Sequence, residues 1–506
     1  MRVLAAILAV SAALGASLES YMSPAARAQL EHRPSAMRRD IHDVDTTVLN
    51  VDLNVTAFRT SVMMQDGTSV NFTTRAYNEQ IPGPTIYVTP GDTFTITLRN
   101  QLQPGRTNAT NLHLHGLHLA DELTPIQPQA TSVLSYTIPQ DHPSGTYWYH
   151  PHLHGLLNSQ MSGLMAGAIV ILDRIQDMPP TLQSIPDHIA ILQGVCTSGC
   201  PNQHDVLESA IQADDRGFQP QVASSLPHGI VSLVVNGESA PTIRVVEQEW
   251  FRVRWINAVA NNGIELVLPC TAHLIARDGV TKSTWPRVSL IVIPPGGRAD
   301  VVMQCERGLH TVQADNSTER NEWLGVLHRV PSQLVMQIQA ETTQASEAIQ
   351  IKPLQAGPPQ VTLPWYMTKT NHHEGEGRCS VEYAFTTDKA GNGDVVFGVN
   401  HVMMTETDPG TALAKNVSTT WCLGSDADHS HPFHIHTTHF RVLSSKKWHE
   451  SRPELYSPDE WRDTIPLYKD HVRLRFIPAV SGSMLSHCHI AWHADRGMGR
   501  MFHVED

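Results

Sequence analysis

Residues 84–100 read PTIYVTPGDTFTITLRN, and residues 241–257 read PTIRVVEQEWFRVRWIN. Both stretches begin with Pro-Thr-Ile and end in Asn, at an offset of 157 residues from Pro84 to Pro241. Apolar and polar side chains alternate along both, which is the period of a half-buried β-strand. A repeat of this length indicates duplicated domains rather than a short solenoid unit.

The rest of the chain has the same character. Turn residues such as Pro90-Gly91 and Pro295-Gly296-Gly297 punctuate short β-rich runs, and a third, weaker copy of the repeat begins near Val399-Asn400. Long stretches of helical periodicity are scarce. We therefore predict an all-β fold of three Greek-key β-sandwich domains, at about 40–178, 179–345 and 346–506.

The composition suits packed domains and points to metal. The 506 residues are 41% hydrophobic, and the net charge is −13. This acidic balance argues against a nucleic-acid partner, which needs a clustered basic surface. The 29 histidines nearly equal the 36 Lys and Arg residues. Because neutral imidazole is the commonest metal ligand in proteins, this count favours metal binding.

The N-terminus has the features of an export signal. Arg2 precedes an apolar run from Leu4 to Leu14, and small residues follow at 15–17, with a second candidate cleavage site at 26–28. We predict a signal peptide over about 1–28, and hence a secreted protein, extracellular or periplasmic. The apolar run is too short to span a bilayer, so no membrane anchor is expected.

The seven cysteines allow disulfide bonds in an exported protein. Cys488 lies between two histidines, so it is the cysteine we expect to stay unpaired. Cys196 and Cys200 could close a small loop, and the remaining pairings stay open.

Histidines gather in four clusters, two in the first predicted domain and two in the last. On a strand, residues i and i+2 face the same side, roughly 6.6 Å apart, so each His-x-His pair presents two imidazoles together. Four such pairs could converge on a multinuclear site, and eight imidazoles are too many for one ion but suit three. The clusters comprise His113 and His115; His150 and His152, followed by His154; His431, His434 and His436; and His487, His489 and His493.

Cys488 adds a second site to this pattern. Strand alternation turns it away from His487 and His489, so it can bind a different metal while its neighbours hold the cluster. A thiolate, two imidazoles and a weak axial Met form the donor set of a blue-copper centre. Here that set is Cys488, His431, His493 and Met498. Zinc fits less well, because structural zinc sites are cysteine-rich and catalytic ones use about three protein ligands.

These motifs resemble those of the multicopper oxidases, the laccase-like family of three cupredoxin domains. The resemblance includes the segment 81–102 (IPGPTIYVTPGDTFTITLRNQL), the segment 235–258 and all four histidine clusters. It implies cupredoxin-like sandwiches and four coppers per chain, of which one is type 1, one is type 2 and two form a type 3 pair.

The resemblance also implies a role for each ligand position. His154 would be an extra histidine outside the ligand set. Ala494 stands where some bacterial members have a Glu that helps to deliver protons, so Asp495, or Asp121 and Glu122, could carry protons instead. The implied ligands are His431, Cys488, His493 and Met498 at type 1; His113 and His434 at type 2; and His115, His150, His152, His436, His487 and His489 at the type 3 pair.

We therefore predict an oxidase that couples four one-electron oxidations to the reduction of O₂ to water. Electrons would enter at the type 1 site and pass through Cys488, His487 and His489. The reducing substrate would be a small phenol or aromatic amine, or, as the alternative, a metal ion, Cu(I) or Fe(II). A non-catalytic copper-binding protein is a further alternative, although it would not need Cys488 between two cluster histidines. A two-domain nitrite reductase is usually shorter. The chain could be a monomer or a homo-oligomer.

Overall fold

The computed structural model describes residues 20–26, 48–105, 107–121, 123–180, 182–183, 185–198, 230–324, 329–342, 361–369, 379–389, 395–405, 408–425, 430–445 and 460–506. The apolar run at 4–14 and residues 343–360 lie outside these residues. Strands dominate the described part of the chain, and they form six sheets.

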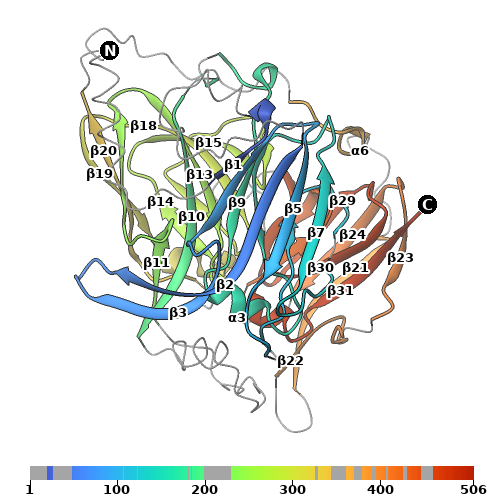
Figure 1. Ribbon diagram of the computed structural model, residues 1–506. Helices are drawn as coiled ribbons and strands as arrows, with labels where there is room; N and C mark the ends of the chain where they lie inside the picture. The colour runs from blue at the N-terminus through green and yellow to red at the C-terminus, as the bar shows by residue number, and fades with distance from the viewer. Residues whose placement is uncertain are drawn as a thin grey trace.

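The sheets pack in pairs as three sandwiches, coloured blue, green to yellow, and orange to red along the chain (Figure 1). This arrangement confirms the predicted all-β, cupredoxin-like fold. The domain boundaries near 178 and 345 stay a prediction.

The first sandwich pairs two sheets. One has the order β1 (Ser20–Met22), β4 (Gly83–Val88), β9 (Gly167–Ile171), β8 (Gly145–His150), β6 (His113–His115). The other has the order β3 (Ser69–Tyr77), β2 (Leu49–Met63), β5 (Thr93–Asn100), β7 (Thr131–Thr137).

The second sandwich has the same plan. One sheet runs β11 (Ile230–Val235), β10 (Asp187–Ser198), β13 (Trp250–Asn257), β18 (Arg298–Gln304), β15 (Thr271–Arg277), β16 (Val280–Thr281). The other runs β12 (Thr242–Val246), β20 (Gln333–Glu341), β19 (Gly308–Ala314), β14 (Ile264–Val267), β17 (Leu290–Ile293).

The third sandwich carries the C-terminal half of the site. One sheet runs β22 (Val395–Val399), β21 (Val381–Lys389), β24 (Thr419–Ser425), β29 (Asp470–Phe476), β26 (Phe440–Ser445), β27 (Trp461–Arg462). The other runs β23 (Thr411–Ala414), β31 (Gly499–Glu505), β30 (Gly482–Cys488), β25 (His431–Ile435), β28 (Thr464–Leu467).

Each sandwich has its own hydrophobic core between its two sheets, because alternate residues of each strand face inward. Strand β5 shows this alternation along its whole length, with buried residues at every second position. Trp148, Trp255 and Trp421 are fully buried, one in each sandwich.

The three sandwiches share a turn built on asparagine. Asn78, Asn236 and Asn400 have φ values of 54°, 53° and 51°, in the left-handed region that asparagine tolerates. The side-chain oxygen of Asn236 accepts the Ile191 N–H at 2.9 Å, and its amide donates to the Ile189 carbonyl at 2.7 Å. Asn78 and Asn400 make the same pair of contacts to strands β2 and β21. The third sandwich therefore has the same turn at Asn400, close to where the third copy of the repeat was predicted to begin.

The two quoted repeats lie on β4–β5 and β12–β13. Their final asparagines, Asn100 and Asn257, act alike. The side-chain amide of Asn100 donates to the carbonyls of Asn108 and Ile126. The amide of Asn257 donates to the carbonyls of Asn262 and Ile293. The shared letters therefore mark backbone-binding positions where each strand ends.

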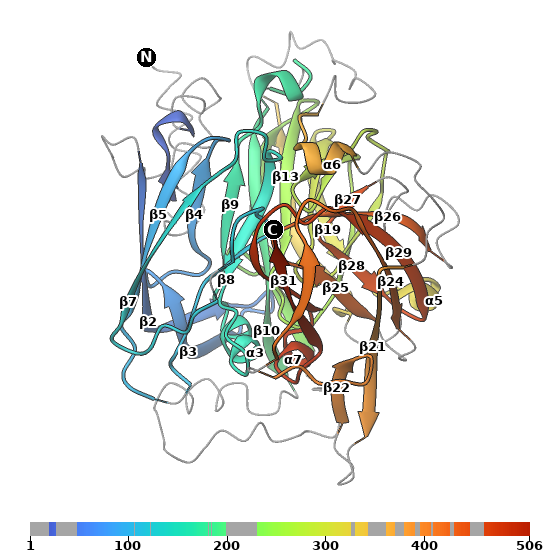
Figure 2. The ribbon, with the colours of Figure 1, turned by 90° about the vertical axis from the view of Figure 1, so that its right-hand side faces the viewer.

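Helices are short and lie between the sandwiches. Helices α3 (Leu157–Ser162) and α7 (Ala491–Ala494) lie side by side, joining the first sandwich to the third (Figure 2). None of the helices in the described part of the chain has the length and apolar character needed to cross a bilayer. The other short helices are α5 (Asn321–Leu324), α6 (Trp365–Thr368) and the 3₁₀ turns η3 (Ile175–Asp177) and η4 (Thr318–Arg320).

Residues 20–26 belong to the first sandwich. Strand β1 pairs in parallel with β4, with Tyr21 opposite Ile86. Tyr21 and Ala26 are buried in it. Of the two candidate cleavage sites, cleavage at 15–17 would leave β1 in place, whereas cleavage at 26–28 would remove it.

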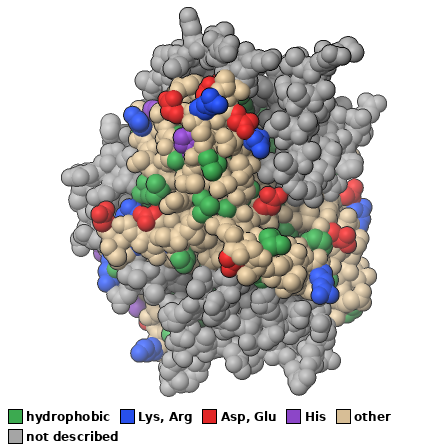
Figure 3. Space-filling view, turned by 90° about the vertical axis from the view of Figure 1, so that its left-hand side faces the viewer, with side chains coloured by type: hydrophobic (Ala, Val, Ile, Leu, Met, Phe, Trp, Pro, Cys, Tyr) green, Lys and Arg blue, Asp and Glu red, His purple; other side chains and the backbone are tan. Residues whose placement is uncertain are grey.

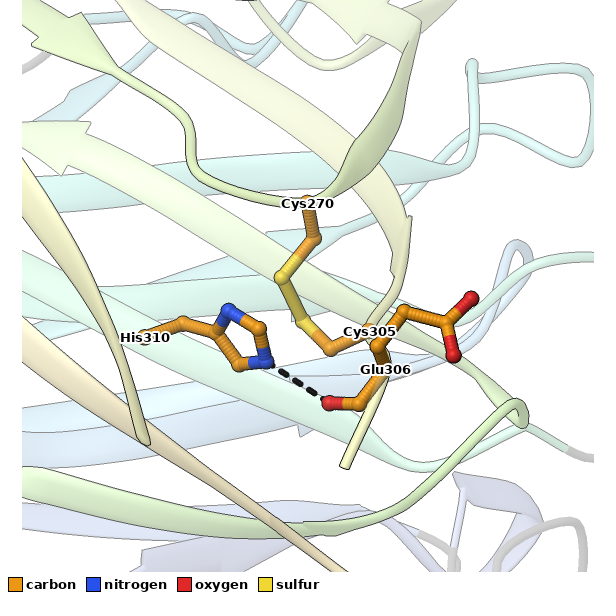
Figure 4. The surroundings of a disulfide bond; sticks show 4 residues. All are labelled: Cys270, Cys305, Glu306 and His310. Atoms are coloured by element: carbon orange, nitrogen blue, oxygen red, sulfur yellow. Dashed lines mark hydrogen bonds between the residues drawn. A yellow bond between two sulfur atoms is a disulfide. The ribbon is translucent and has the colours of Figure 1, made fainter. Parts of the chain in front are cut away.

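Two disulfides lie in the described residues, Cys270–Cys305 and Cys379–Cys422, and Cys488 is the free cysteine there, as predicted. His310 lies beside the first disulfide and donates to the Glu306 carbonyl at 2.7 Å (Figure 4). Because both sulfurs are bonded to each other, this group does not offer thiolates to a metal. The side chains of Cys196 and Cys200 lie outside the described part.

The outer face of the second sandwich is mixed in character. Lys and Arg are interspersed with Asp and Glu, and hydrophobic side chains form small separate groups (Figure 3). The described residues of this face do not form the single-signed basic patch that nucleic acids bind.

Candidate metal centre

Cys488, His431 and His493 bring three donor atoms together in the third sandwich. Cys488 Sγ lies 3.6 Å from Nδ1 of each histidine, and the two Nδ1 atoms are 3.2 Å apart. Metal bonds of roughly 2.0–2.3 Å place three ligands of a trigonal site about 3.5–4 Å apart. All three side chains are fully buried, and Met498 packs in the same core. This triangle suits one metal ion, and its donor set is that of blue copper.

Strand alternation separates Cys488 from its histidine neighbours. On β25 and β30, Phe433 pairs with Cys488 and His434 with His487. Cys488 and Phe433 lie in the hydrophobic core, whereas His487 lies against His152 of the first sandwich, with Nε2 atoms 3.0 Å apart. One strand thus supplies a donor to each of two neighbouring sites.

A second group of eight histidines lies between the first and third sandwiches. Rings from the two sandwiches stack directly: His113 on His436 with centroids 3.9 Å apart, and His115 on His434 at 3.8 Å. All eight are at most 7% exposed. The predicted His-x-His pairs therefore converge. The eight are His113, His115, His150, His152, His434, His436, His487 and His489.

The tautomers of five of these rings follow from their outer contacts. A nitrogen that faces a carbonyl or carboxylate oxygen must be an N–H, so the other nitrogen carries a lone pair. In all five the outer nitrogen is Nδ1, which leaves Nε2 bare and directed into the group. The contacts join His150 to the Pro151 carbonyl (2.9 Å), His434 to the Asp463 carbonyl (2.9 Å), His487 to the Cys488 carbonyl (2.8 Å), and His113 (3.1 Å) and His436 to the Asp121 carboxylate.

These bare nitrogens fit a metal cluster. His436 Nε2 and His487 Nε2 face each other at 3.2 Å with two lone pairs, which cannot hydrogen bond to one another. Among the described residues, Nε2 of His113, His150 and His434 has no hydrogen-bond partner although it is buried. Buried polar atoms are normally paired, and a cation between the rings would satisfy all of them.

His115 is turned the other way. Its Nε2 lies 3.4 Å from Oδ1 of Asp463, so Nδ1 carries the lone pair, and this atom has no partner in the described part of the chain. His115 would therefore bind a metal through Nδ1 rather than Nε2.

Burial keeps these rings neutral. The pKa values of His115, His150 and His487 lie well below the usual range, first because burial disfavours the imidazolium and then because further imidazoles surround each ring. The pKa of His436 falls to about 4 for the same first reason. Neutral imidazole is the form that binds metal. Burial also raises the pKa of the Cys488 thiol, so a bound metal would have to displace its proton.

Asp121 joins the two halves of the group. One oxygen accepts from His113 of the first sandwich, and the other from His436 of the third. Burial alone would raise its pKa, but the two histidines bring it below its usual range. This carboxylate orients two rings, as second partners of metal-binding histidines commonly do.

Asp495, another of the predicted acidic residues, has a different role in the structure. Asp495 accepts the backbone N–H groups of Gly155, Leu157 and Asn158 at 2.8–3.2 Å, so it caps helix α3 from the third sandwich. Burial raises its pKa to about 7. Glu122 lies outside the described residues. His154 is half-buried at the α3 turn.

Three residues at the centre were missed by the sequence analysis. Asp463 contacts His115 and His434, and Arg298 of the second sandwich binds both oxygens of Asp463, at 2.8 and 2.5 Å. Gly296, with φ +81°, lies so close to His489 that a Cβ would be 2.5 Å from its ring. The sequence Pro295-Gly296-Gly297 was the only signal for any of the three. It predicted a turn, but it did not indicate that Gly296 would lie against His489.

The fold and the donor sets together define a copper-binding protein of β-sandwich domains. Multicopper oxidase family models match residues 59–176 and 378–506. The chain therefore belongs to the multicopper oxidases.

Similar proteins include laccases and metal-transport oxidases. Laccase-1 of Thanatephorus cucumeris is 28% identical over 48% of this chain and 42% of its own length. The iron transport multicopper oxidase FET5 of Saccharomyces cerevisiae is 21% identical over 84% of this chain and 75% of that one. The alignments with the laccases span less than half of those enzymes' own length.

Solved structures share the fold. The multicopper oxidase of Campylobacter jejuni, described as a metallo-oxidase, superposes with a TM-score of 0.70 at 19% identity, covering 97% of this chain and 95% of that one.

Proposed function

We propose that this chain is an oxidase that couples four one-electron oxidations of a phenol or aromatic amine to the reduction of O₂ to two waters. One observation carries the proposal: Cys488 belongs to a three-atom donor triangle while His487, its neighbour on the same strand, faces a histidine of the first sandwich. Adjacent residues thus join two metal sites.

We assign four coppers to these donors. The Nε2 contacts among His152, His436 and His487 support one copper of a type 3 pair. The ring contacts among His115, His150 and His489 support the other. The type 2 ligands would be His113 and His434. The type 1 ligands would be His431, Cys488 and His493, with Met498 axial.

Bound copper would supply the one-electron redox chemistry and the site of O₂ reduction. The chain's own residues fix the arrangement. Asp121 and Asp463 hold ligand histidines in one tautomer, and Arg298 holds Asp463. The stacked histidines exclude water from a fully buried group.

A small hollow of about 30 Å³ lies beside His431. It lies between the second and third sandwiches, and Ser430 and Pro432, which flank His431, line it. Leu324 and Ile490 give it apolar walls, and Arg329, paired with Glu265, gives it a polar edge. The hollow has about the volume of one water molecule, so it does not enclose an aromatic ring, and a phenol would meet this lining only at the surface.

Metal oxidation is the second candidate. Met403 is 49% exposed and lies against Gly497, next to Met498. A thioether at the surface is a soft donor that suits Cu(I). Several relatives are named as metal-transport oxidases or metallo-oxidases, which supports the same alternative.

The test uses copper-loaded protein. Metal analysis should find about four coppers per chain, as the donor count implies. Turnover is then compared for a phenol, Cu(I) and Fe(II), in wild type and Met403→Ala. Phenol oxidation that Met403→Ala leaves unchanged supports the first candidate. If the enzyme oxidises only Cu(I), and Met403→Ala oxidises it more slowly than wild type, the metal-oxidase candidate replaces the phenol-oxidase candidate.

We also propose that the chain is exported, with cleavage at 15–17. N-terminal sequencing of the exported protein should find a start before Ser20, because β1 is part of the first sandwich. A start after residue 26 would contradict this.

A further inference from the structure

Five Asn-x-Ser/Thr motifs occur in the chain, and the metal centre uses none of them. This tripeptide is the acceptor sequence for N-linked sugars in secreted proteins, and a bulky sugar needs its asparagine at the surface. All five motifs lie in the described residues, so their surroundings can be compared. They begin at Asn54, Asn71, Asn108, Asn316 and Asn416.

Asn108 has no room for a sugar. It is 1% exposed, and Thr110, the hydroxyl residue of its motif, is fully buried. Asn108 Nδ2 donates to the Gln103 carbonyl at 3.0 Å, and its Oδ1 accepts from the buried guanidinium of Arg75 at 2.8 Å. A sugar on Nδ2 would force these groups apart, so a chain modified here cannot reach this fold.

Asn54 is held within its sheet. It is half-buried on β2, which pairs with β3 on one side and with β5 on the other. Asn54 Nδ2 lies 3.4 Å from Oδ1 of Asn78, the turn residue, and Asn54 Oδ1 accepts from Gln101 at 3.1 Å. Both ends of this amide are therefore committed to neighbours in the first sandwich.

Asn316 and Asn416 lie at exposed turns. Asn316 follows β19 and precedes η4, and Asn416 lies between β23 and β24 with a φ of 61°. Both are exposed, and so are the hydroxyl residues of their motifs, Thr318 and Ser418. Neither side-chain amide makes a hydrogen bond within the described part of the chain. A sugar at either position would extend into solvent.

Asn71 lies on a strand, but its side chain faces outward. Strand β3 is an edge strand, and it belongs to the β2–β3 hairpin whose tip projects from the first sandwich (Figure 1). Phe72 packs with Val195 and Val234 of the second sandwich. Strand alternation therefore turns Asn71 to the opposite face, where it is exposed and lies across from the exposed Ser61.

We propose that Asn71, Asn316 and Asn416 carry N-linked sugars and that Asn54 and Asn108 do not. This rests on the proposed export, because the sugar is transferred as the chain enters the secretory pathway. The donor is a lipid-linked oligosaccharide. A bond forms between Nδ2 and C1 of the first sugar, the bond from C1 to the lipid pyrophosphate breaks, and Nδ2 loses one proton. The pyrophosphate leaves with the electron pair, so nothing is oxidised or reduced.

The three sites are spread over the molecule, one on each sandwich, and they avoid the metal centre. The proposed copper ligands lie on or near other elements, namely β6, β8, β25, β30 and α7. The sugars would therefore cover outer surfaces only. Enzymatic removal of the sugars from the folded protein should leave its copper content and turnover unchanged.

The experiment secretes the full chain from a eukaryotic host that attaches N-linked sugars to exported proteins. The folded protein is purified from the medium. An amidase that releases N-linked sugars then converts each sugar-bearing Asn to Asp in heavy-oxygen water, and peptide mass spectrometry locates the label. We expect label at Asn71, Asn316 and Asn416, and none at Asn54 or Asn108.

Single variants provide the matched comparison. Asn71→Gln, Asn316→Gln and Asn416→Gln should each remove one sugar chain from the intact mass. Asn108→Gln also destroys a motif, but it should leave the number of sugar chains as in wild type. If Asn108→Gln fails to fold, the peptide map of wild type still decides the state of Asn108.

Failure of the export and failure of the glycosylation can be told apart. If the full chain stays inside the cell without sugar, the proposed export is wrong and the glycosylation falls with it. If the folded protein reaches the medium but lacks sugar at Asn71, Asn316 and Asn416, or carries sugar at Asn108, the export holds and the proposed selection of sites is wrong.

Discussion

At the scale of single residues, the centre depends on groups that hold ligands as much as on the ligands. Asp121 spans two rings from different sandwiches, and Asp463 is fixed by both ends of the Arg298 guanidinium. Such outer partners typically change metal affinity or activity 10–100-fold when removed. The arrangement is therefore set by tertiary contacts.

Cys488→Ser tests whether Cys488 and His487, neighbours on strand β30, bind two different metal sites. Serine lacks the thiolate, so the blue absorption and substrate oxidation should disappear while copper remains at the histidine cluster, about three per chain. Metal analysis and absorption spectra measure both. A variant that stays blue and active would contradict the assignment of Cys488.

Gly296→Ala tests whether the second sandwich helps to position His489 in the histidine cluster. A Cβ there would overlap the His489 ring, and a left-handed φ costs an alanine about 1–2 kcal/mol. We expect lost cluster copper and lost O₂ reduction, with the blue absorption kept. Gly67→Ala is the matched control, because Gly67 has the same φ of +81° with nothing within 4 Å. Equal behaviour of the two variants would show that backbone strain, and not contact with His489, is responsible.

The ligands could be predicted from the sequence because the two histidines of a His-x-His pair on a strand must face the same side. The roles of Arg298 and Asp463 could not be predicted from the sequence, because the side chain of a charged residue is ordinarily exposed to solvent. Only the packing of β18 against the β27–β28 segment makes this a buried ion pair. The acidic residues predicted for proton delivery had no positional signal in the sequence. Asp495 caps helix α3, and its role in proton delivery stays a prediction.

At the scale of elements, the asparagine turns tie each sandwich together. Asn78, Asn236 and Asn400 follow β3, β11 and β22, and each binds the backbone of the antiparallel partner strand, β2, β10 or β21, by two hydrogen bonds. All three have a conformation that most residues avoid. The quoted repeat predicted strands β4, β5, β12 and β13, and the turn explains why the three copies keep the same topology although the third has diverged in sequence.

Asn236→Ala should lower the free energy of unfolding by about 1–3 kcal/mol, because it leaves two backbone groups of β10 without their partner and strains φ. Denaturant unfolding of wild type and variant measures this. Asn236→Asp keeps the acceptor oxygen and should lose less. If Asn236→Asp lost as much free energy of unfolding as Asn236→Ala, the proposed role of the side-chain oxygen would be wrong.

At the scale of the whole molecule, the eight-histidine group is a buried contact between the first and third sandwiches, and Arg298 and Gly296 of the second sandwich pack against it. The number of sandwiches could be predicted from the repeat and the clusters. Their relative placement could not, because it depends on contacts such as His113 on His436 and helix α3 on α7, which are distant in sequence.

Removing copper should therefore destabilise the molecule. Ligands that bind only in the folded state add stability, by about 4 kcal/mol at 1,000 times the Kd. We expect a lower Tm after chelation and recovery after copper is restored, measured by calorimetry. An unchanged Tm would contradict a copper cluster between the two sandwiches.

In the function proposed above, this centre reduces O₂ fully to water with electrons from an organic reductant. The most direct test follows O₂ uptake and phenol oxidation together in copper-loaded wild type. We expect one O₂ to be consumed for every four one-electron oxidations, with no hydrogen peroxide formed. Two oxidations per O₂ with accumulating peroxide, or no O₂ uptake in fully loaded protein, would contradict it.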